Sequence, residues 1–162
     1  MSKKIEEFKL DRYDRRILEL LQADGRLSNQ ELAEKIGLSP APCWRRVRRL
    51  EAAGLIEGYS ANLNPHKLGL TVTAFTFVSL ENHHPGSVEA FDRVIRDCPE
   101  VMECHSLSGQ HDFLLRIVAA DLAAYESFLS THVLGIASVR SASTSFVLKS
   151  QKSTTRIPLP AP

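Results

Sequence analysis

No stretch of this sequence stays apolar for long enough to cross a membrane. A transmembrane helix needs about 20 consecutive apolar residues, and polar or charged residues interrupt every apolar run well before that length. Residues 1–7 carry no apolar stretch behind their lysines, so no secretory signal peptide is expected. We therefore predict a cytoplasmic protein without a membrane partner.

Cysteines and catalytic motifs are also scarce. The chain has three cysteines, an odd number with no C-x-x-C pair, so neither a disulfide framework nor a zinc site is indicated. There is no Gly-x-Ser-x-Gly elbow, no P-loop and no metal-ligand cluster. Ser108 and His111 come nearest to a nucleophile and base, but a serine in a turn is usually only a turn residue. The sequence predicts no enzyme, no cofactor and no metal.

Charge is nearly balanced overall, at a net +1, but it is unevenly distributed. Residues 1–58 carry twelve Lys/Arg and ten Asp/Glu, whereas residues 59–162 carry eight and nine. Residues 39–50 hold four arginines and no acid. Such a local basic patch is typical of a nucleic-acid contact, although four arginines on a helix are often only a solvated face.

Local signals predict two short helices in the first forty residues. Asp11 suits the N-cap of the first helix and Gly25 its end. Ser28 and Glu31 match a capping box for the second, which Gly37 ends. The buried faces would be Leu10, Ile17, Leu18 and Leu21 in the first helix and Leu32, Ala33 and Ile36 in the second.

A third helix follows after only about three residues, as in a helix-turn-helix. Ser39 suits its N-cap and Pro40 its first position, and Gly54 would close it. Its inward stripe would be Cys43, Val47 and Leu50, with Trp44 packed beside them. Residues 55–63 would then form an extended linker or a wing strand.

The second helix of a helix-turn-helix enters the DNA major groove, so its exposed side supplies the predicted DNA contacts. These are Ser39, Pro40, Ala41, Pro42, Arg45, Arg46, Arg48 and Arg49. Arg45 and Arg46, nearer the start of the helix, are predicted to contact bases, and Arg48 and Arg49 phosphates. The four acidic residues Asp14, Glu19, Glu31 and Glu34 lie at helix-surface spacings.

After Gly54 the helical spacing ends, and from Thr71 the sequence shows the alternation typical of strands. Strands are expected at residues 71–80, 101–107, 113–119 and 139–148. One helix opens at Pro85 and stops at Pro99, and Asp121 caps another. The order β-α-β-β-α-β is ferredoxin-like, which makes the chain α+β.

Both faces of this sheet need cover. The first strand places Val72, Ala74, Phe75 and Phe77 across its two faces, whereas two helices cover only one. A second subunit is the simplest cover for the other face, so we predict a homodimer.

Several motifs resemble the leucine-responsive regulatory protein/AsnC family of amino-acid-responsive transcription regulators. They lie, in order along nearly the whole chain, at residues 14–18 with 25–26, 29–37, 38–51, 99–101, 108–115, 145–149 and 154–159. The resemblance implies a winged helix-turn-helix, a RAM-type effector domain, dimers that often stack into an octamer, and an amino acid bound between dimers.

The effector-binding residues that this resemblance implies are Glu103, Gly109, Gln110, His111, Asp112, Thr144 and Ser145. Asp112 would accept from the ammonium group, while backbone amides around Gly109 would hold the carboxylate. The alternative is an ordinary hairpin turn in which Asp112 bonds its own backbone. Gln110, His111 and Ala142 depart from the family pattern near this pocket. Leucine or methionine is the expected effector, because the loop offers no second charge.

We divide the chain into a helix-turn-helix domain (8–58), a linker or hinge strand (59–69), a βαββαβ effector-binding and oligomerisation domain (70–150) and a tail (151–162). The predicted function is a sequence-specific DNA-binding regulator whose assembly or DNA affinity responds to an amino acid. Two alternatives stay open. One is an architectural DNA-binding protein with a ligand-free sensor domain, and the other is a regulatory small-molecule-binding module.

Overall fold

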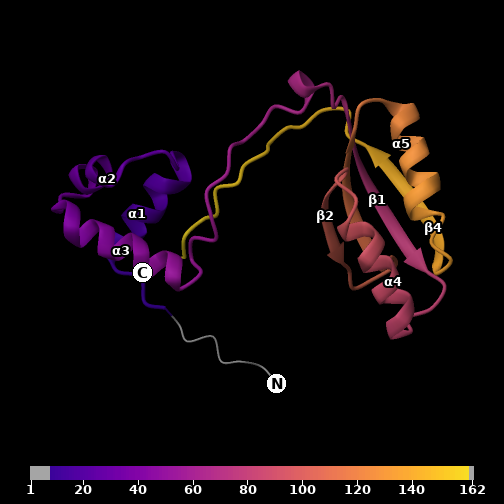
Figure 1. Cartoon of the computed structure of the whole chain (residues 1–162), viewed down its shortest axis with the longest axis horizontal. Helices are drawn as coiled ribbons and strands as arrows, with labels where there is room; N and C mark the ends of the chain where they lie inside the picture. The colour runs from indigo at the N-terminus through magenta and orange to yellow at the C-terminus, as the bar shows by residue number, and fades with distance from the viewer. Residues whose placement is uncertain (1–7, 161–162) are drawn as a thin grey trace. The chain divides into compact units, whose positions relative to one another are not determined.

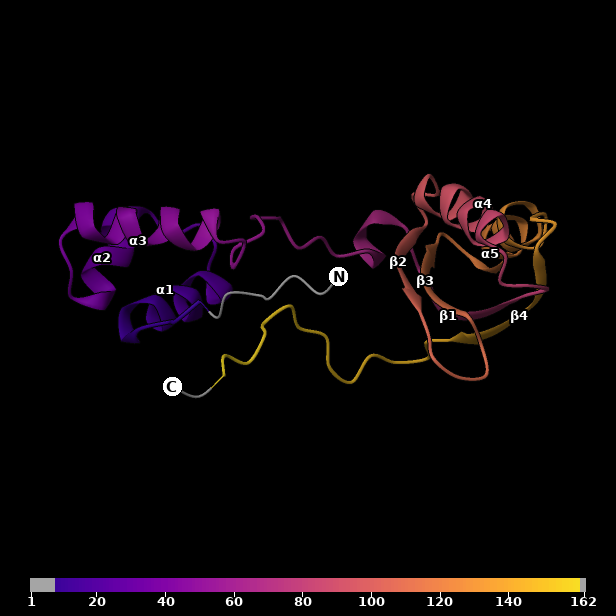
Figure 2. The same cartoon turned by 90° about the horizontal axis from the view of Figure 1, so that it is seen from below.

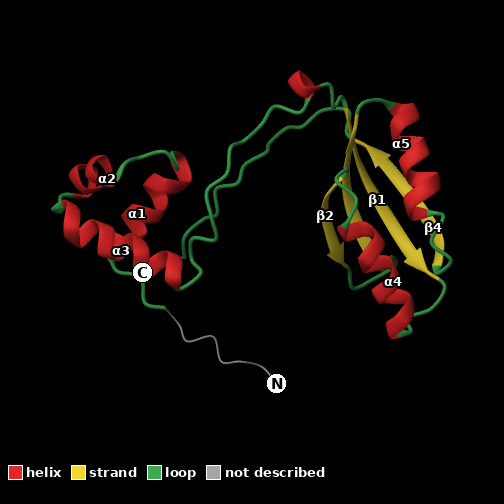
Figure 3. Ribbon diagram, in the orientation of Figure 1, coloured by secondary structure: helices red, strands yellow, loops and turns green. Residues whose placement is uncertain are grey.

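The computed structural model describes residues 8–160, which divide into two compact units. One unit is helical and contains residues 8–62 together with 152–160, and the other, Leu63–Gln151, is built on a β-sheet. Figures 1 and 3 show the elements of each unit. Each unit has a hydrophobic core of its own.

The helical unit contains the three predicted helices, α1 (Arg12–Ala23), α2 (Asn29–Ile36) and α3 (Pro40–Ala52). Asp11 caps α1 as predicted, and the predicted capping box of α2 is formed. Gly37 ends α2 at φ 70°, in a left-handed conformation that a Cβ would disfavour. The buried core consists of Ile17, Leu18, Leu32, Ala33, Cys43 and Leu50.

The connection after α3 is extended rather than paired. Residues 57–64 form no strand, so the linker is observed and the wing strand is not. A single 3-10 turn, η1 (His66–Leu68), precedes the sheet.

Residues 152–160, predicted only as a polar tail, pack against α1 in the helical unit. Gln22 accepts from the Ile157 N–H at 2.5 Å and donates to its carbonyl at 3.1 Å. Arg15 donates to the Pro160 carbonyl, and Leu159 packs on the helical core. The end of the chain is therefore part of the helical unit.

The second unit has the predicted βαββαβ order. Its elements are β1 (Val72–Leu80), α4 (Pro85–Arg96), β2 (Val101–Ser106), β3 (Phe113–Ala119), α5 (Leu122–Phe128), the π-helical turn η2 (Leu129–Val133) and β4 (Val139–Phe146). The strands lie in the order β2-β3-β1-β4, and each pair is antiparallel. The strands β2 and β4 end slightly before the predicted Leu107 and Leu148.

Helices α4 and α5 cover one face of this sheet (Figure 2). Ala74, Thr76 and Val78 of β1 are buried on that side, and the alternate residues Phe75 and Phe77 are half-buried on the other. The side away from the helices is termed the open face. Strand register assigns to it Phe75, Phe77, Leu114, Arg116, Ser143 and Ser145.

Candidate nucleic-acid interface and effector loop

The side of α3 opposite its buried residues exposes a stripe at helical spacing, termed the outer stripe. It consists of Ala41, Trp44, Arg45 and Arg48. Trp44 is 55% exposed, so the prediction that it packs beside the core is wrong. The stripe combines an aromatic surface with two guanidinium groups, which suits contact with base edges and phosphates.

The two arginines of the outer stripe are only weakly engaged by the protein. Among the described residues, Arg45 has no ion pair. Arg48 contacts Glu51 at 3.0 Å, one turn along the same helix. Exposed pairs of this kind contribute a few tenths of a kcal/mol, about 0.3–0.5. Both guanidinium groups are therefore available to a ligand.

The other two arginines of α3 turn toward α1, where they meet a buried carboxylate. Asp14 is 0% exposed. It accepts from Arg46 at 2.9 Å and from Arg49 at 2.5 Å. Arg46 also contacts Asp11 at 2.6 Å and lies over the Tyr13 ring. These contacts form a cluster of two acidic and two basic side chains between α1 and α3.

The electrostatics of this cluster favour its charged state. Burial opposes the charge on Arg46, but hydrogen bonds from its guanidinium to Asp11 and Asp14 outweigh it and raise the pKa of Arg46. Burial likewise opposes the charge on Asp11, and the Asp14 N–H and Arg46 outweigh it and lower the pKa of Asp11. The pairing of Arg46 with Asp11 thus favours the charged form of both side chains.

This cluster corrects two features of the sequence interpretation. Asp14 is not on the helix surface, and the acid-free run 39–50 is compensated by acids about thirty residues earlier in the chain. The sequence showed that Asp11 and Asp14 lie near the start of a helix. Their pairing with arginines 32 to 35 residues away depends on how α3 crosses α1, which no local signal reports.

The start of α3 is held by the preceding helix. Asn29 Nδ2 donates to the Pro40 carbonyl at 2.8 Å. The Ser39 hydroxyl makes no capping bond, and Ser39, Pro40 and Ala41 are exposed. A fixed helix N-terminus with exposed residues is a suitable place for a phosphate oxygen.

In the sheet unit, the loop between β2 and β3 carries four of the predicted effector residues, which are Gly109, Gln110, His111 and Asp112. Gly109 has φ 148°, which residues with a Cβ rarely adopt. Asp112 accepts from the Leu80 N–H at 2.7 Å and contacts His83 Nε2 at 2.6 Å. Its carboxylate therefore joins this loop to the segment after β1, a contact that the turn alternative did not include.

The same two partners shift the pKa of Asp112. The hydrogen bond to His83, followed by the Leu80 N–H, stabilises the carboxylate and lowers its pKa. His111 lies beside Asp112, with Nδ1 at 3.2 Å from the Ser79 hydroxyl and its ring 5.2 Å from that of Phe77. His83 was not among the predicted site residues, and only the fold brings it to this loop.

The remaining predicted effector residues do not share one surface. Ser145 pairs with Phe75 on the open face. Thr144 points the other way, toward α5, where its hydroxyl lies 2.5 Å from that of Tyr125. Glu103 pairs with Arg116 at 2.8 Å on the open face. Thr144 and Ser145 of one chain therefore cannot line the same side of a pocket.

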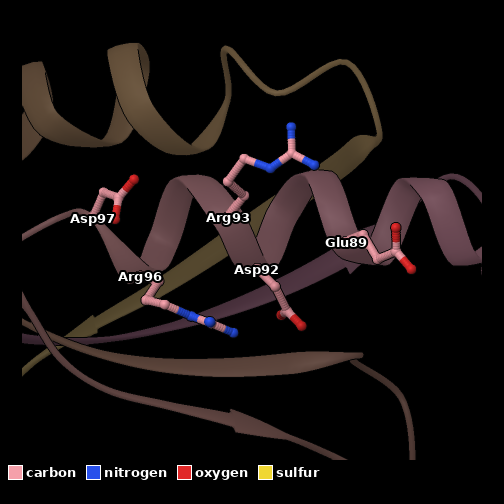
Figure 4. Close-up of a pocket in the computed structure, with 5 residues that line it drawn as sticks. All are labelled: Glu89, Asp92, Arg93, Arg96 and Asp97. Carbon is pink, nitrogen blue, oxygen red and sulfur yellow. The ribbon is translucent and has the colours of Figure 1, made fainter.

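A hollow of about 480 Å³ lies on the surface of α4. Figure 4 shows its lining of charged side chains, which are Glu89, Asp92, Arg93, Arg96 and Asp97. None of the residues that line it is hydrophobic, whereas small-molecule pockets are usually lined by hydrophobic and aromatic side chains. Within residues 8–160 no group of three His, Cys, Asp or Glu is placed to hold a metal. Over the same range, no helix is long and apolar enough to span a membrane.

A helix-turn-helix with a cationic outer stripe, joined to a βαββαβ domain, defines a DNA-binding regulator with a sensor domain. The winged helix-turn-helix DNA-binding family matches residues 10–57, and the Lrp/AsnC ligand binding domain matches residues 73–157. The chain belongs to the Lrp/AsnC family of transcription regulators, as its motifs predicted.

Relatives match along most of the chain. The leucine-responsive regulatory protein of Escherichia coli is 42% identical over 156 residues, 96% of this chain and 95% of its own. That of Serratia marcescens is 42% identical over 148 residues, 91% of this chain and 90% of its own. A transcriptional regulator of Neisseria meningitidis, solved as its L-Met complex, has a TM-score of 0.89 at 41% identity, covering 93% of this chain and 97% of its own.

Proposed function

We propose that α3 reads DNA through its outer stripe and its first turn. The proposed contacts are Ser39, Pro40, Ala41, Pro42, Trp44, Arg45 and Arg48. The observation that carries this proposal is that Arg45 and Trp44 are exposed, side by side, on the second helix of a helix-turn-helix. Arg46 and Arg49, which the sequence placed in the same set, are not counted because Asp14 holds their guanidinium groups.

The test is a gel-shift comparison of wild type, Arg45→Ala and a matched Lys35→Ala variant on promoter fragments. A bidentate arginine–guanine contact discriminates by about 1–3 kcal/mol, so Arg45→Ala should weaken the preferred fragment and relax preference at one position. Lys35 is an exposed cation at the end of α2 and controls for charge alone. Equal loss in both variants on every fragment would contradict base reading by Arg45.

We further propose that the sheet unit binds an apolar amino acid, with the loop from Gly109 to Asp112 forming part of the site. Support comes from the family match and from two relatives, one named leucine-responsive and one solved with L-Met. In this proposal Gly109 admits a close approach to the backbone, while Asp112 keeps the loop in place and faces the ammonium group. Gln110, His111, Glu103, Ser145 and Thr144 are assigned to the surroundings, and Thr144 acts only through α5.

Thermal shift with leucine and methionine tests this proposal, because a ligand that binds only the folded state raises the melting temperature by mass action. The D-enantiomers are the control, since they have the same charges but the wrong geometry. An L-specific shift that Asp112→Ala abolishes without loss of fold supports the site. No shift with leucine, methionine or any other of the twenty amino acids, screened in the same way, favours the architectural DNA-binding alternative.

The open face suits a second copy of the chain. Phe75 and Phe77 are half-buried there with no helix over them, and a dimer would cover them and present two recognition helices. We therefore propose a homodimer, able to stack into octamers, that acts in the cytoplasm on DNA and has no enzymatic activity. Phe77→Glu should shift the mass in light scattering from dimer to monomer.

A further inference from the structure

We infer that Asp14 is a positioning residue that sets how many arginines of α3 the DNA meets. It holds Arg46 and Arg49 against α1, so the outer stripe alone contributes cations to binding. The inference rests on the proposed DNA contact. It concerns a residue that would itself touch no DNA.

The burial of Asp14 makes this hold strong. A carboxylate with no exposed surface is costly unless charged donors satisfy it, and both of its oxygens have such donors, Arg46 on one and Arg49 on the other. The Asp14 Oδ2 atom also accepts from the Asp11 N–H at 3.2 Å. An arginine that moved to a phosphate would leave this buried charge with one partner fewer.

Both arginines have further contacts on the same side. Arg46 keeps only 26% of its side chain exposed, contacts Asp11 and lies 5.2 Å from the centre of the Tyr13 ring. Arg49, 51% exposed, lies 5.1 Å from the centre of the Phe8 ring. Each guanidinium thus has both an anion and an aromatic ring on the α1 side.

The consequence concerns counterions. Each phosphate that a protein cation neutralises releases condensed ions, and log K falls with log salt by about 0.9 per phosphate. Arginines neutralised by Asp14 release none. The salt dependence of binding should therefore report Arg45 and Arg48 and should not report Arg46 or Arg49.

The experiment measures that slope. Binding of wild type and variants to a fluorescent duplex of mixed sequence is followed by anisotropy across salt concentrations. In Asp14→Asn, Arg49 loses the one ion pair that it makes within residues 8–160 and becomes free to reach phosphate. The slope should steepen by about 0.9 per recognition helix, which is about a 3.5-fold larger loss of affinity for a fourfold rise in salt.

Two controls isolate the cause. Asp24→Asn removes one negative charge from the same unit. In the part of the chain that the structure describes, the Asp24 carboxylate has no ion pair and accepts from the backbone N–H of Arg26, so the slope of this variant should equal the wild-type slope. Arg49→Gln added to Asp14→Asn should remove the gain, because it removes the released cation. A merely structural role for Asp14 would weaken binding without steepening the slope.

A second comparison needs no change at Asp14 and decides the inference if Asp14→Asn fails to fold by circular dichroism. In the otherwise wild-type chain, Arg48→Gln should reduce the slope by about 0.9 per helix and Arg49→Gln should leave it unchanged. Equal reductions would overturn the inference, as would equal slopes for Asp14→Asn and Asp24→Asn. A wild-type protein that does not bind the duplex would instead refute the proposed DNA contact.

Discussion

The two units of this protein bury polar groups in opposite ways. In the helical unit the fully buried polar side chain is Asp14, a charge compensated by two arginines from another helix. In the sheet unit Thr76 is buried at the same depth, but it is neutral, and its hydroxyl lies 2.9 Å from that of Tyr125. A charge cluster therefore joins α1 to α3, whereas hydroxyl groups join α5 to the sheet.

The difference matters because the groups that hydrogen-bond to Asp14 and to Thr76 differ in their capacity to bind other molecules. A buried hydroxyl carries no charge that could attract a ligand once its hydrogen bonds are made. An arginine held by a buried acid remains a cation that a nucleic acid would attract, so the acid also decides what the surface offers. In the proposed DNA contact, charge burial in the helical unit thus bears on binding, whereas hydroxyl burial in the sheet unit serves packing.

The largest expected effect tests whether the two units are energetically separate at all. Phe91 is fully buried in the sheet unit and stacked on Phe113 at 4.5 Å between ring centres. Phe91→Ala should cost about 3–5 kcal/mol of unfolding free energy. Hydrogen exchange should place that loss in β1, β3 and α4.

Leu50→Ala is the matched change in the helical core, where Leu50 is also fully buried. It should cost about 2–5 kcal/mol and expose the amides of α1 to α3. If either substitution reduces protection equally in both units, they unfold as one body and the comparison between them fails.

The sequence predicted most of the fold because the signals that form its elements are local. Asp11, Ser28 and Gly37 act within a few residues of their own position, and alternation along β1 is visible without any partner strand. The βαββαβ order follows from the sequence of these elements.

The sites were less predictable because they depend on contacts between distant segments. Asp14 with Arg49 spans 35 residues, and Asp112 with His83 spans 29. The separation of Thr144 from Ser145 was accessible in principle, since adjacent residues of a strand face opposite sides. The docking of Leu159 was not, because nothing in a short proline-rich segment indicates which helix it meets.

A smaller effect sharpens the contrast between charged and neutral burial. Asp14→Ala should lower the unfolding free energy by about 2 kcal/mol. This is less than the summed contribution of the hydrogen bonds that Asp14 accepts from charged groups, because the half-exposed guanidinium of Arg49 can hydrogen-bond to water instead. Tyr125→Phe should lower the unfolding free energy by about 1 kcal/mol, because the Thr76 and Thr144 hydroxyls, 3.3 Å apart, can still hydrogen-bond to each other. Urea unfolding measures both, and a larger loss for Tyr125→Phe would reverse the contrast.

The smallest effect is a pH dependence located in the loop of the sheet unit. His83 and the Leu80 N–H lower the pKa of Asp112 in the folded chain, whereas in the unfolded chain it titrates near its ordinary value of about 3.9. As the pH falls below about 4, the unfolded chain therefore takes up this proton first, and the stabilisation present at neutral pH is lost as the pH passes through the folded pKa.

Asp112→Asn keeps an oxygen for the Leu80 N–H but cannot titrate. The difference in urea midpoint between wild type and Asp112→Asn should shrink as the pH falls below about 4. Midpoints of Asp112→Asn that follow those of wild type in parallel down to acid pH would show that the contacts of Asp112 do not favour its charged form.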